Sequence, residues 1–252
     1  MKNFTTKFDE ELLDIGIDGD EPGFYSYFPQ MLPWIGCEYE SSRFKRLLII
    51  GESHYLPDDA DEDLLDPDIW YNQDHKDYYS VGEEIEQNTN TRTFVSLGHW
   101  SSRAHSIYRE PERLIKNLIT RNSKQTENET GNALRYVAYY NYFLRPAKKG
   151  QSIKQILIPP NNAEEMGVDE KYADDTFREL VGIIKPDFVY FLSKFAYDTY
   201  MKNNKTVYNF KSDYSPHPCC AWWNRKHINY HEKILSGKEK MIEFLVSNRV
   251  FE

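Results

Sequence analysis

Short, almost wholly apolar runs constrain the fold of this chain more than any other feature of its sequence. Residues 46–50 (RLLII) stop at Gly51, and residues 187–192 (DFVYFL) form a second run of this kind. Such runs are typical of parallel strands that are buried on both faces of a sheet. Residues 133–142 and 206–210 are rich in β-branched and aromatic side chains, which predicts two further strands.

Stretches with helical spacing lie between and around these strands. The expected helices cover residues 8–15, 91–121 with an interruption near 99–102, 171–184, 195–202 and 227–248. Strands that alternate with helices build βαβ units. The predicted fold is therefore α/β, a three-layer sandwich with a central, mostly parallel sheet of about four strands between helices. Residues 22–36, with three prolines, are predicted to form an irregular packed loop.

The length and composition of the chain favour one folded domain. Of its 252 residues, 40% are hydrophobic and 15% are aromatic, so a large core can form and general disorder is excluded. We expect a single α/β domain over residues 1–252, with an N-terminal extension over 1–43 and an acidic insertion over 56–90. Residues 57–68 hold seven carboxylates, which should keep this part of the insertion exposed.

Charge is distributed unevenly along the chain. The formal net charge is −9, yet residues 1–90 hold 6 Lys and Arg against 22 Asp and Glu, whereas residues 91–252 hold 25 against 18. Tight, non-specific binding of nucleic acid needs clustered cations, and the overall acidity disfavours it. A basic face built from the later part of the chain remains compatible with these numbers.

The cysteine, histidine and apolar content excludes several other classes of protein. Cys37, Cys219 and Cys220 are too few for a disulfide framework or a four-cysteine metal site. His227 and His231 have a spacing that can hold a metal on one helix face, but no third ligand follows, so we expect a solvated helix and no metal. The sequence contains neither an apolar run of roughly 18 residues nor the apolar core of a signal peptide. We therefore expect a cytoplasmic protein with no membrane partner.

Chemically active residues follow three of the predicted strands. Residues 51–55 (GESHY) follow the first strand, Asn141 lies at the end of the second, and residues 215–220 (SPHPCC) follow the last. In open parallel sheets, ligands bind at the carboxyl ends of the strands. The sequence therefore predicts one site assembled from these three segments.

The order of these motifs resembles that of the uracil-DNA glycosylase superfamily. In that superfamily a G-Q-D-P-Y or G-E-x-P-G loop, an Asn at a strand end and a His-Pro-Ser loop follow one another. The counterparts here are Gly51-Glu52-Ser53-His54-Tyr55, Asn141 and His217-Pro218-Cys219. Residues 184–190 also resemble the K-P-D segment that precedes a hydrophobic strand. The likeness covers roughly residues 44–220.

The resemblance implies hydrolysis of an N-glycosidic bond in DNA, after the base has been flipped out of the helix. The Asn141 amide would read the edge of the base, because it offers a donor and an acceptor side by side. His217 would stabilise the negative charge on the departing base, and Glu52 would activate water. Gly51, Ser53, His54, Tyr55 and Pro218 would line the substrate site. DNA or a nucleotide is the implied partner, and no metal or organic cofactor is implied.

Departures from the superfamily pattern leave other functions open. Ser53 stands where the classical members have a catalytic Asp, His54 replaces the loop proline, and Cys219 replaces the serine of the third loop. A non-catalytic protein that binds a nucleotide or nucleic acid on the same fold is therefore one alternative. A serine esterase is another, with Ser53 as nucleophile and Asp213 and His217 as its partners. Trp222 and Trp223, just after the third loop, are candidates for a wedge in a base stack.

Overall fold

The fold is taken from a computed structural model that describes residues 3–16, 23–57, 60, 62–71, 88–100, 105–123, 131–157, 166–203, 208–228 and 234–252. The helices in these residues are α1 (Asp9–Leu13), α2 (Phe24–Tyr27), α3 (Pro67–Tyr71), α5 (Thr91–Trp100), α6 (Ser106–Ser123), α8 (Val168–Ile184), α9 (Lys194–Asn203) and α10 (Gly237–Ser247). The strands are β1 (Trp34–Ile35), β2 (Leu47–Gly51), β3 (Tyr55–Leu56), β4 (Val137–Asn141), β5 (Ala147–Lys148), β6 (Phe188–Phe191), β7 (Lys211–Tyr214), β8 (His227–Ile228) and β9 (Ile234–Leu235).

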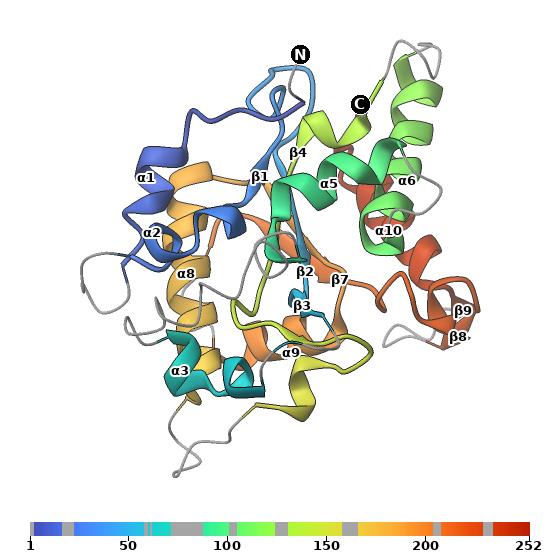
Figure 1. The fold of residues 1–252 in the computed structure, drawn as a ribbon. Coiled ribbons are helices and arrows are strands. Elements are labelled where there is room, and N and C mark those ends of the chain that lie inside the picture. The colour runs from blue at the N-terminus through green and yellow to red at the C-terminus, as the bar shows by residue number, and fades with distance from the viewer. Residues whose placement is uncertain are drawn as a thin grey trace.

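The central sheet has five strands in the order β1-β4-β2-β6-β7 (Figure 1). Strands β4, β2, β6 and β7 are parallel to one another, and the added edge strand β1 is antiparallel to β4. In this register Leu47 lies opposite both Val137 and Phe188. The prediction that the runs 46–50, 136–140 and 187–192 form neighbouring parallel strands is therefore confirmed.

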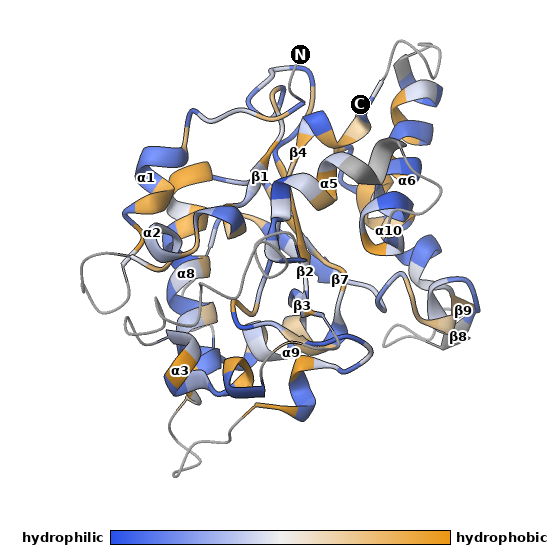
Figure 2. Ribbon diagram, viewed as in Figure 1, coloured by the Kyte–Doolittle hydropathy of each residue, from blue (hydrophilic) through white to orange (hydrophobic). Residues whose placement is uncertain are grey.

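Helices cover both faces of the sheet, which confirms the three-layer α/β prediction. Successive residues of β2 point to opposite faces: Leu48 and Ile50 pack with α1, α8 and α9, whereas Leu47 and Ile49 pack with α5, α6 and α10. All four of these side chains are fully buried. Figure 2 shows the matching pattern, with hydrophobic residues where the helices meet the sheet and hydrophilic residues on outer turns of α1 and α6.

The predicted fourth strand is wrong in position. The strand that pairs with β6 is β7, which begins at Lys211, and residues 208–210 precede it without strand structure. Tyr208 and Phe210 stack on each other with ring centroids 4.8 Å apart, and both contact Phe177 of α8. These aromatic side chains therefore pack against α8 instead of joining the sheet. Residues 206 and 207 lie outside the described residues.

The predicted C-terminal helix begins ten residues later than expected, at Gly237. Ser236 caps it in a reciprocal arrangement: the Ser236 hydroxyl accepts from the Glu239 N–H at 3.2 Å, and the Glu239 carboxylate accepts from the Ser236 N–H at 2.8 Å. The two-stranded pair β8–β9 precedes the helix. His227 is therefore in a strand, and the helical His227–His231 spacing does not apply; residue 231 lies outside the described residues.

Two further segments differ from the predictions in detail. The predicted loop 22–36 contains α2, a 3-10 turn at Pro29–Met31 and strand β1. Residues 133–136 form a 3-10 turn rather than the start of β4, because the Asn132 side chain accepts from the Leu134 N–H and caps that turn.

A buried ion pair anchors the described part of the acidic insertion. Arg145 is fully buried, and its guanidinium donates to the Asp169 carboxylate at 2.8 and 2.5 Å. It also donates to the Leu65 and Ile156 carbonyls, and the Tyr71 hydroxyl donates to Asp169 at 3.0 Å. The described carboxylates of residues 62–68 are exposed as predicted, while Arg145 holds the backbone beneath them. Within the described residues, no helix is long and apolar enough to cross a bilayer.

Candidate active site at the carboxyl edge of the sheet

The three predicted motifs lie along one edge of the central sheet. Residues 51–55 begin at the end of β2, Asn141 ends β4, and residues 215–220 follow β7, so all three lie at carboxyl ends of parallel strands. The chain runs from β2 to β4 on one side and then to β6 on the other. Strand β2 therefore lies where the strand order reverses, and ligands of open α/β sheets bind in the crevice at that point.

Backbone hydrogen bonds fix the loop after β2 against the loop after β4. The carbonyls of residues 51, 52 and 54 accept from the N–H groups of residues 142, 143 and 147 at 3.1, 2.9 and 2.9 Å. The short strands β3 and β5 then pair in parallel. The two loops thus form one continuous wall beside the carboxyl edge.

Asn141 and Tyr139 converge above Gly51. A Cβ atom at Gly51 would lie 2.1 Å from Asn141 Oδ1 and 2.2 Å from the Tyr139 hydroxyl oxygen, so this position admits no side chain. The Tyr139 hydroxyl donates to Asn141 Oδ1 at 3.3 Å. Asn141 is 4% exposed, and its Nδ2 makes no hydrogen bond of normal geometry among the described residues, although the buried Tyr108 hydroxyl lies close enough to the Asn141 side chain to oppose the burial-driven rise of the Tyr108 pKa. A buried amide that keeps an unused donor can bind a ligand or a water molecule.

Two serine hydroxyls orient the Glu52 carboxylate. Ser152 donates to Oε1 at 2.7 Å, and Ser193 donates to Oε2 at 2.5 Å. Each carboxylate oxygen keeps a further lone pair, so Glu52 can still accept a hydrogen bond from water. The Ser193 hydroxyl also accepts from the Ala196 N–H at 3.2 Å, at the start of α9. Glu52 is therefore held in one orientation from two sides.

His217 has a defined tautomer in its neutral form. Its Nδ1 accepts from the Cys219 N–H at 3.1 Å, so the proton of the neutral ring is on Nε2. Burial lowers the pKa of His217 below its usual 6.5, and the nearby Glu52 carboxylate opposes this shift without reversing it. At neutral pH the ring is therefore uncharged and has Nε2–H as its remaining donor. Pro218, next in the chain, is buried and stiffens the loop.

The His54 ring, unlike that of His217, forms a structural hydrogen bond through Nε2. The Thr91 hydroxyl donates to the Met31 carbonyl at 3.2 Å, and His54 Nε2 lies 3.1 Å from the same hydroxyl. A hydroxyl has one proton, so His54 Nε2–H must donate to Thr91. Burial lowers the pKa of His54 to about 3, which keeps the ring neutral. This edge of the His54 ring ties the loop to α5 and is not available to a substrate.

Ser53 and Tyr55 differ in their access to solvent. Ser53 is buried, and its hydroxyl has no partner among the described residues. Tyr55 is 36% exposed. Partial burial raises the pKa of Tyr55, and the neighbouring Glu52 and Cys219 side chains raise it further. Tyr55, at the end of the first loop, is therefore partly open to solvent and lies near Cys219 of the third loop.

The geometry is not that of a serine-esterase triad. Such a triad needs the histidine Nδ1–H to donate to a carboxylate, but His217 Nδ1 accepts a hydrogen bond from Cys219. The Asp213 carboxylate lies 2.9 Å from Lys240 Nζ and accepts from the Tyr214 N–H at 2.8 Å. Both members of the expected acid–histidine pair therefore have other partners.

Sequence reasoning missed three residues that shape the site. Tyr139 lies two residues before Asn141, so strand alternation already places both on the same side of β4. Ser193 follows β6 at the same sheet edge as the predicted motifs. Ser152 lies one hundred positions beyond Glu52, and nothing in its local sequence indicates their contact.

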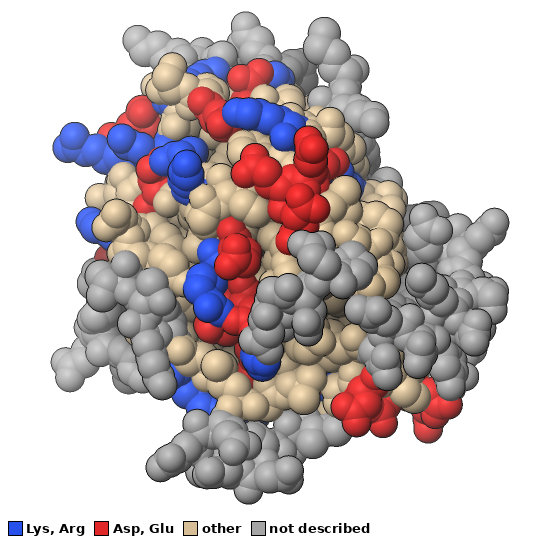
Figure 3. All heavy atoms as spheres, turned by 90° about the vertical axis from the view of Figure 1, so that its left-hand side faces the viewer, with Lys and Arg blue, Asp and Glu red and all other residues tan. Residues whose placement is uncertain are grey.

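Exposed basic residues flank the site. Lys154 and Lys194 follow the two serines that bind Glu52, and Arg225 and Lys226 follow the third loop; all four are exposed. Of the two candidate wedge residues, Trp222 is 51% exposed, whereas Trp223 is fully buried in the core and cannot reach a base stack. On the face that contains α1 and α8, acidic and basic side chains lie interspersed (Figure 3).

The described residues contain no group of three or more His, Cys, Asp or Glu that could hold a metal ion. Comparison with known proteins gives no relative: no protein-family model, curated protein or solved structure matches the chain.

Proposed function

We propose that this protein recognises a nucleobase and hydrolyses its N-glycosidic bond in DNA, as a divergent relative of the uracil-DNA glycosylase superfamily. One observation carries the proposal: the buried Asn141 amide with its unused donor, the Nε2–H of His217 and the oriented carboxylate of Glu52 belong to three loops at one sheet edge. A base needs such polar partners for its edge and its oxygen, and the sugar needs a carboxylate.

Each residue has a role that follows from its protonation and partners. Asn141 Nδ2–H donates to the edge of the flipped base. His217 donates from Nε2 to a base oxygen, on which negative charge grows as the C–N bond breaks. The Cys219 N–H donates to Nδ1 and so keeps the proton of the neutral ring on Nε2. The neutral ring can therefore donate from Nε2 to the base. Glu52 accepts a proton from the attacking water and stabilises the positive charge on the sugar.

The rim of the site supports DNA rather than a free nucleoside as the substrate. Lys154 and Arg225 are exposed around the loops, where they can contact backbone phosphates, and the exposed Lys194 and Lys226 could do so in exchange for their ion pairs with Asp198 and Glu239. Exposed Trp222 supplies an apolar ring that can replace a flipped base in the stack. These contacts favour a strand that passes across the carboxyl edge.

A base-release assay tests the proposal. Single-turnover cleavage would be measured on single- and double-stranded oligonucleotides that contain uracil, hypoxanthine or another damaged base. Glu52→Gln keeps the size and hydrogen-bonding shape of the side chain, so we expect base release to fall about 100-fold or more while binding persists. Glu62→Gln is the matched control, because it removes an exposed carboxylate from a neighbouring loop.

Other outcomes would favour the alternatives. If the wild type cleaves a chromogenic ester but releases no base, and Ser53→Ala abolishes the ester cleavage, the protein is an esterase and the proposal is wrong. Binding of a base-containing oligonucleotide with no release at any protein concentration would favour the non-catalytic binding protein. Equal activity of wild type and Glu52→Gln would contradict the role of that carboxylate.

A further inference from the structure

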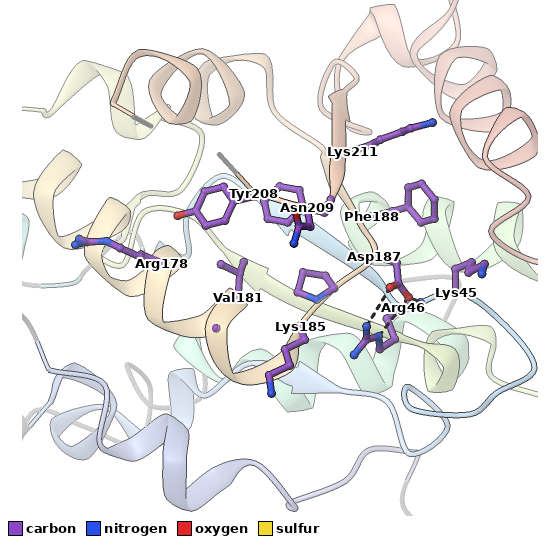
Figure 4. A pocket seen from close by; sticks show the side chains of 13 residues that line it. Lys45, Arg46, Arg178, Val181, Lys185, Asp187, Phe188, Tyr208, Asn209 and Lys211 are labelled. Carbon is purple, nitrogen blue, oxygen red and sulfur yellow. Dashed lines mark hydrogen bonds and ion pairs between the residues drawn. The ribbon is translucent and has the colours of Figure 1, made fainter. Parts of the chain in front are cut away.

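An open pocket of about 620 Å³ lies at the amino edge of the sheet, the edge opposite the candidate active site (Figure 4). It is lined by residues 45–46 before β2, by residues 178, 181 and 182 near the end of α8, by residues 185–188 leading into β6, and by residues 208–211 leading into β7. Its volume is in the range of small-molecule sites, about 300–1,000 Å³. None of its lining residues takes part in the site described above.

The lining of this amino-edge pocket is strongly basic. Five of its residues are Lys or Arg and one, Asp187, is acidic, although the chain as a whole is acidic. Asp187 is already neutralised, because its carboxylate accepts from Arg46 Nε at 3.2 Å and from Arg46 Nη2 at 3.0 Å. These hydrogen bonds lower the pKa of Asp187 despite its partial burial.

Three of the five basic side chains have donors to offer a ligand. Lys45 and Lys185 are exposed; Lys45 lies close enough to the Asp187 carboxylate to help lower its pKa. Arg46 uses Nε and Nη2 for Asp187 and keeps Nη1 for another acceptor. Figure 4 shows these three side chains along one side of the pocket.

The other two basic residues are already engaged. Arg178 pairs with Asp174 and Asp175 on its own helix. The Nζ of Lys211 donates to Asn248 at 3.3 Å, and in Figure 4 its side chain points away from the pocket. Any bound anion is therefore expected beside Lys45, Arg46 and Lys185.

Lys185 occupies a backbone conformation that favours glycine. Its φ and ψ are 47° and 62°, in the left-handed region, where it ends α8. A side chain there costs about 1–2 kcal/mol relative to the right-handed conformation, a cost that glycine avoids. Helices commonly end on glycine for this reason. Stability alone therefore does not favour lysine at this position. The ammonium group that Lys185 brings to the pocket is a functional reason for lysine to be there.

Aromatic rings lie across the pocket from the cations. Tyr208 and Asn209 are opposite Lys185 and Arg46 in Figure 4, and the ring of Phe210 stacks on Tyr208 with an interplanar angle of 14°. Both rings are partly exposed. Planar aromatic ligands stack on such rings, and the side chain of Asn209 offers both a donor and an acceptor.

We infer that the amino-edge pocket binds a nucleoside phosphate, with its phosphates at Lys45, Arg46 and Lys185 and its base against Tyr208 and Phe210. Cations alone would bind any phosphate, and aromatic rings alone would bind any planar ring. Their presence on facing sides of one nucleotide-sized pocket selects a ligand that has both groups. The inference is independent of the proposed glycosylase activity, which uses the other edge of the sheet.

Fluorescence anisotropy with a labelled ATP, and competition by unlabelled ATP and tripolyphosphate, would test this inference. Lys45→Gln/Lys185→Gln removes two charged donors, so we expect about 100-fold weaker binding of ATP. Lys7→Gln/Lys202→Gln removes the same charge from exposed positions outside both sites and should leave ATP affinity unchanged. Tyr208→Leu keeps apolar volume and removes the ring, so it should weaken ATP binding but not tripolyphosphate binding.

Lys185→Gly separates the function of this residue from its effect on folding. Relief of the left-handed strain should leave the protein at least as stable to urea as the wild type, while ATP affinity falls about tenfold. Failure to bind ATP at millimolar concentration would overturn the inference, as would equal losses in both double variants. Binding of tripolyphosphate as tight as that of ATP, unaffected by Tyr208→Leu, would overturn the assignment of the base position. Base release by the same variants reports separately on the glycosylase proposal.

Discussion

Removing Arg145 should destabilise this protein more than removing any exposed cation. In Arg145→Met, the Asp169 carboxylate, 3% exposed, loses both of its charged hydrogen bonds and keeps only the one from Tyr71. The Leu65 and Ile156 carbonyls also lose their donors. Breaking a buried ion pair by removing one partner costs about 3–5 kcal/mol. For a chain of this length that corresponds to a fall in Tm of about 6–20 °C.

Urea unfolding at pH 7, followed by circular dichroism, measures this change. Arg145→Met/Asp169→Leu should recover most of the stability, because replacing both charges leaves no unpaired carboxylate. Lys7→Met is the control: it breaks an exposed ion pair with Glu40 and should cost at most about 1 kcal/mol. A loss below about 1 kcal/mol in Arg145→Met, or no recovery in the double variant, would refute the reasoning.

Two other substitutions have defined outcomes. Gly51→Ala would force a Cβ to within 2.1 Å of Asn141 Oδ1, so we expect the free energy of unfolding in urea to fall by about 1–3 kcal/mol and base binding to be lost. Gly182→Ala is the control: its Cβ would have no neighbour within 4 Å, so its stability should be unchanged or higher. His54 binds a proton near pH 6.5 in the unfolded state but only near pH 3 in the folded state, so the stability of the protein falls as the pH drops below 6.5. At pH 5 this loss of unfolding free energy is about 2 kcal/mol. The loss should vanish in His54→Leu when urea unfolding is compared at pH 7 and pH 5.

The fold could be predicted from local sequence where burial decides the structure. Leu47–Gly51 is buried on both faces, so its composition alone indicates an internal parallel strand. Strand β1 was not predictable in this way, because it has two residues and exists through pairing with β4. Residues 208–210 have strand-like composition but pack on α8, so tertiary packing overrides local propensity there.

The candidate site was predictable in its location but not in its details. The sheet-edge rule places Glu52, Asn141 and His217 together, because each follows a parallel strand. The serines that orient Glu52 and the hydroxyl that binds His54 come from distant segments, and such contacts have no local signature. The tautomer of His217 depends on one backbone N–H two residues away, which only the folded loop places.

Nitrogen-15 NMR of the His217 ring during a titration with uracil tests the central claim most directly, that this sheet edge presents a neutral Nε2–H donor and the Asn141 amide to the same base. We predict a ring at pH 7 with an unprotonated Nδ1 and a protonated Nε2, whose Nε2–H resonance shifts downfield when uracil binds and does not shift in Asn141→Ala. A ring protonated on Nδ1 at pH 7, or an Nε2–H resonance that uracil and other bases leave unchanged in the wild type, would contradict the account.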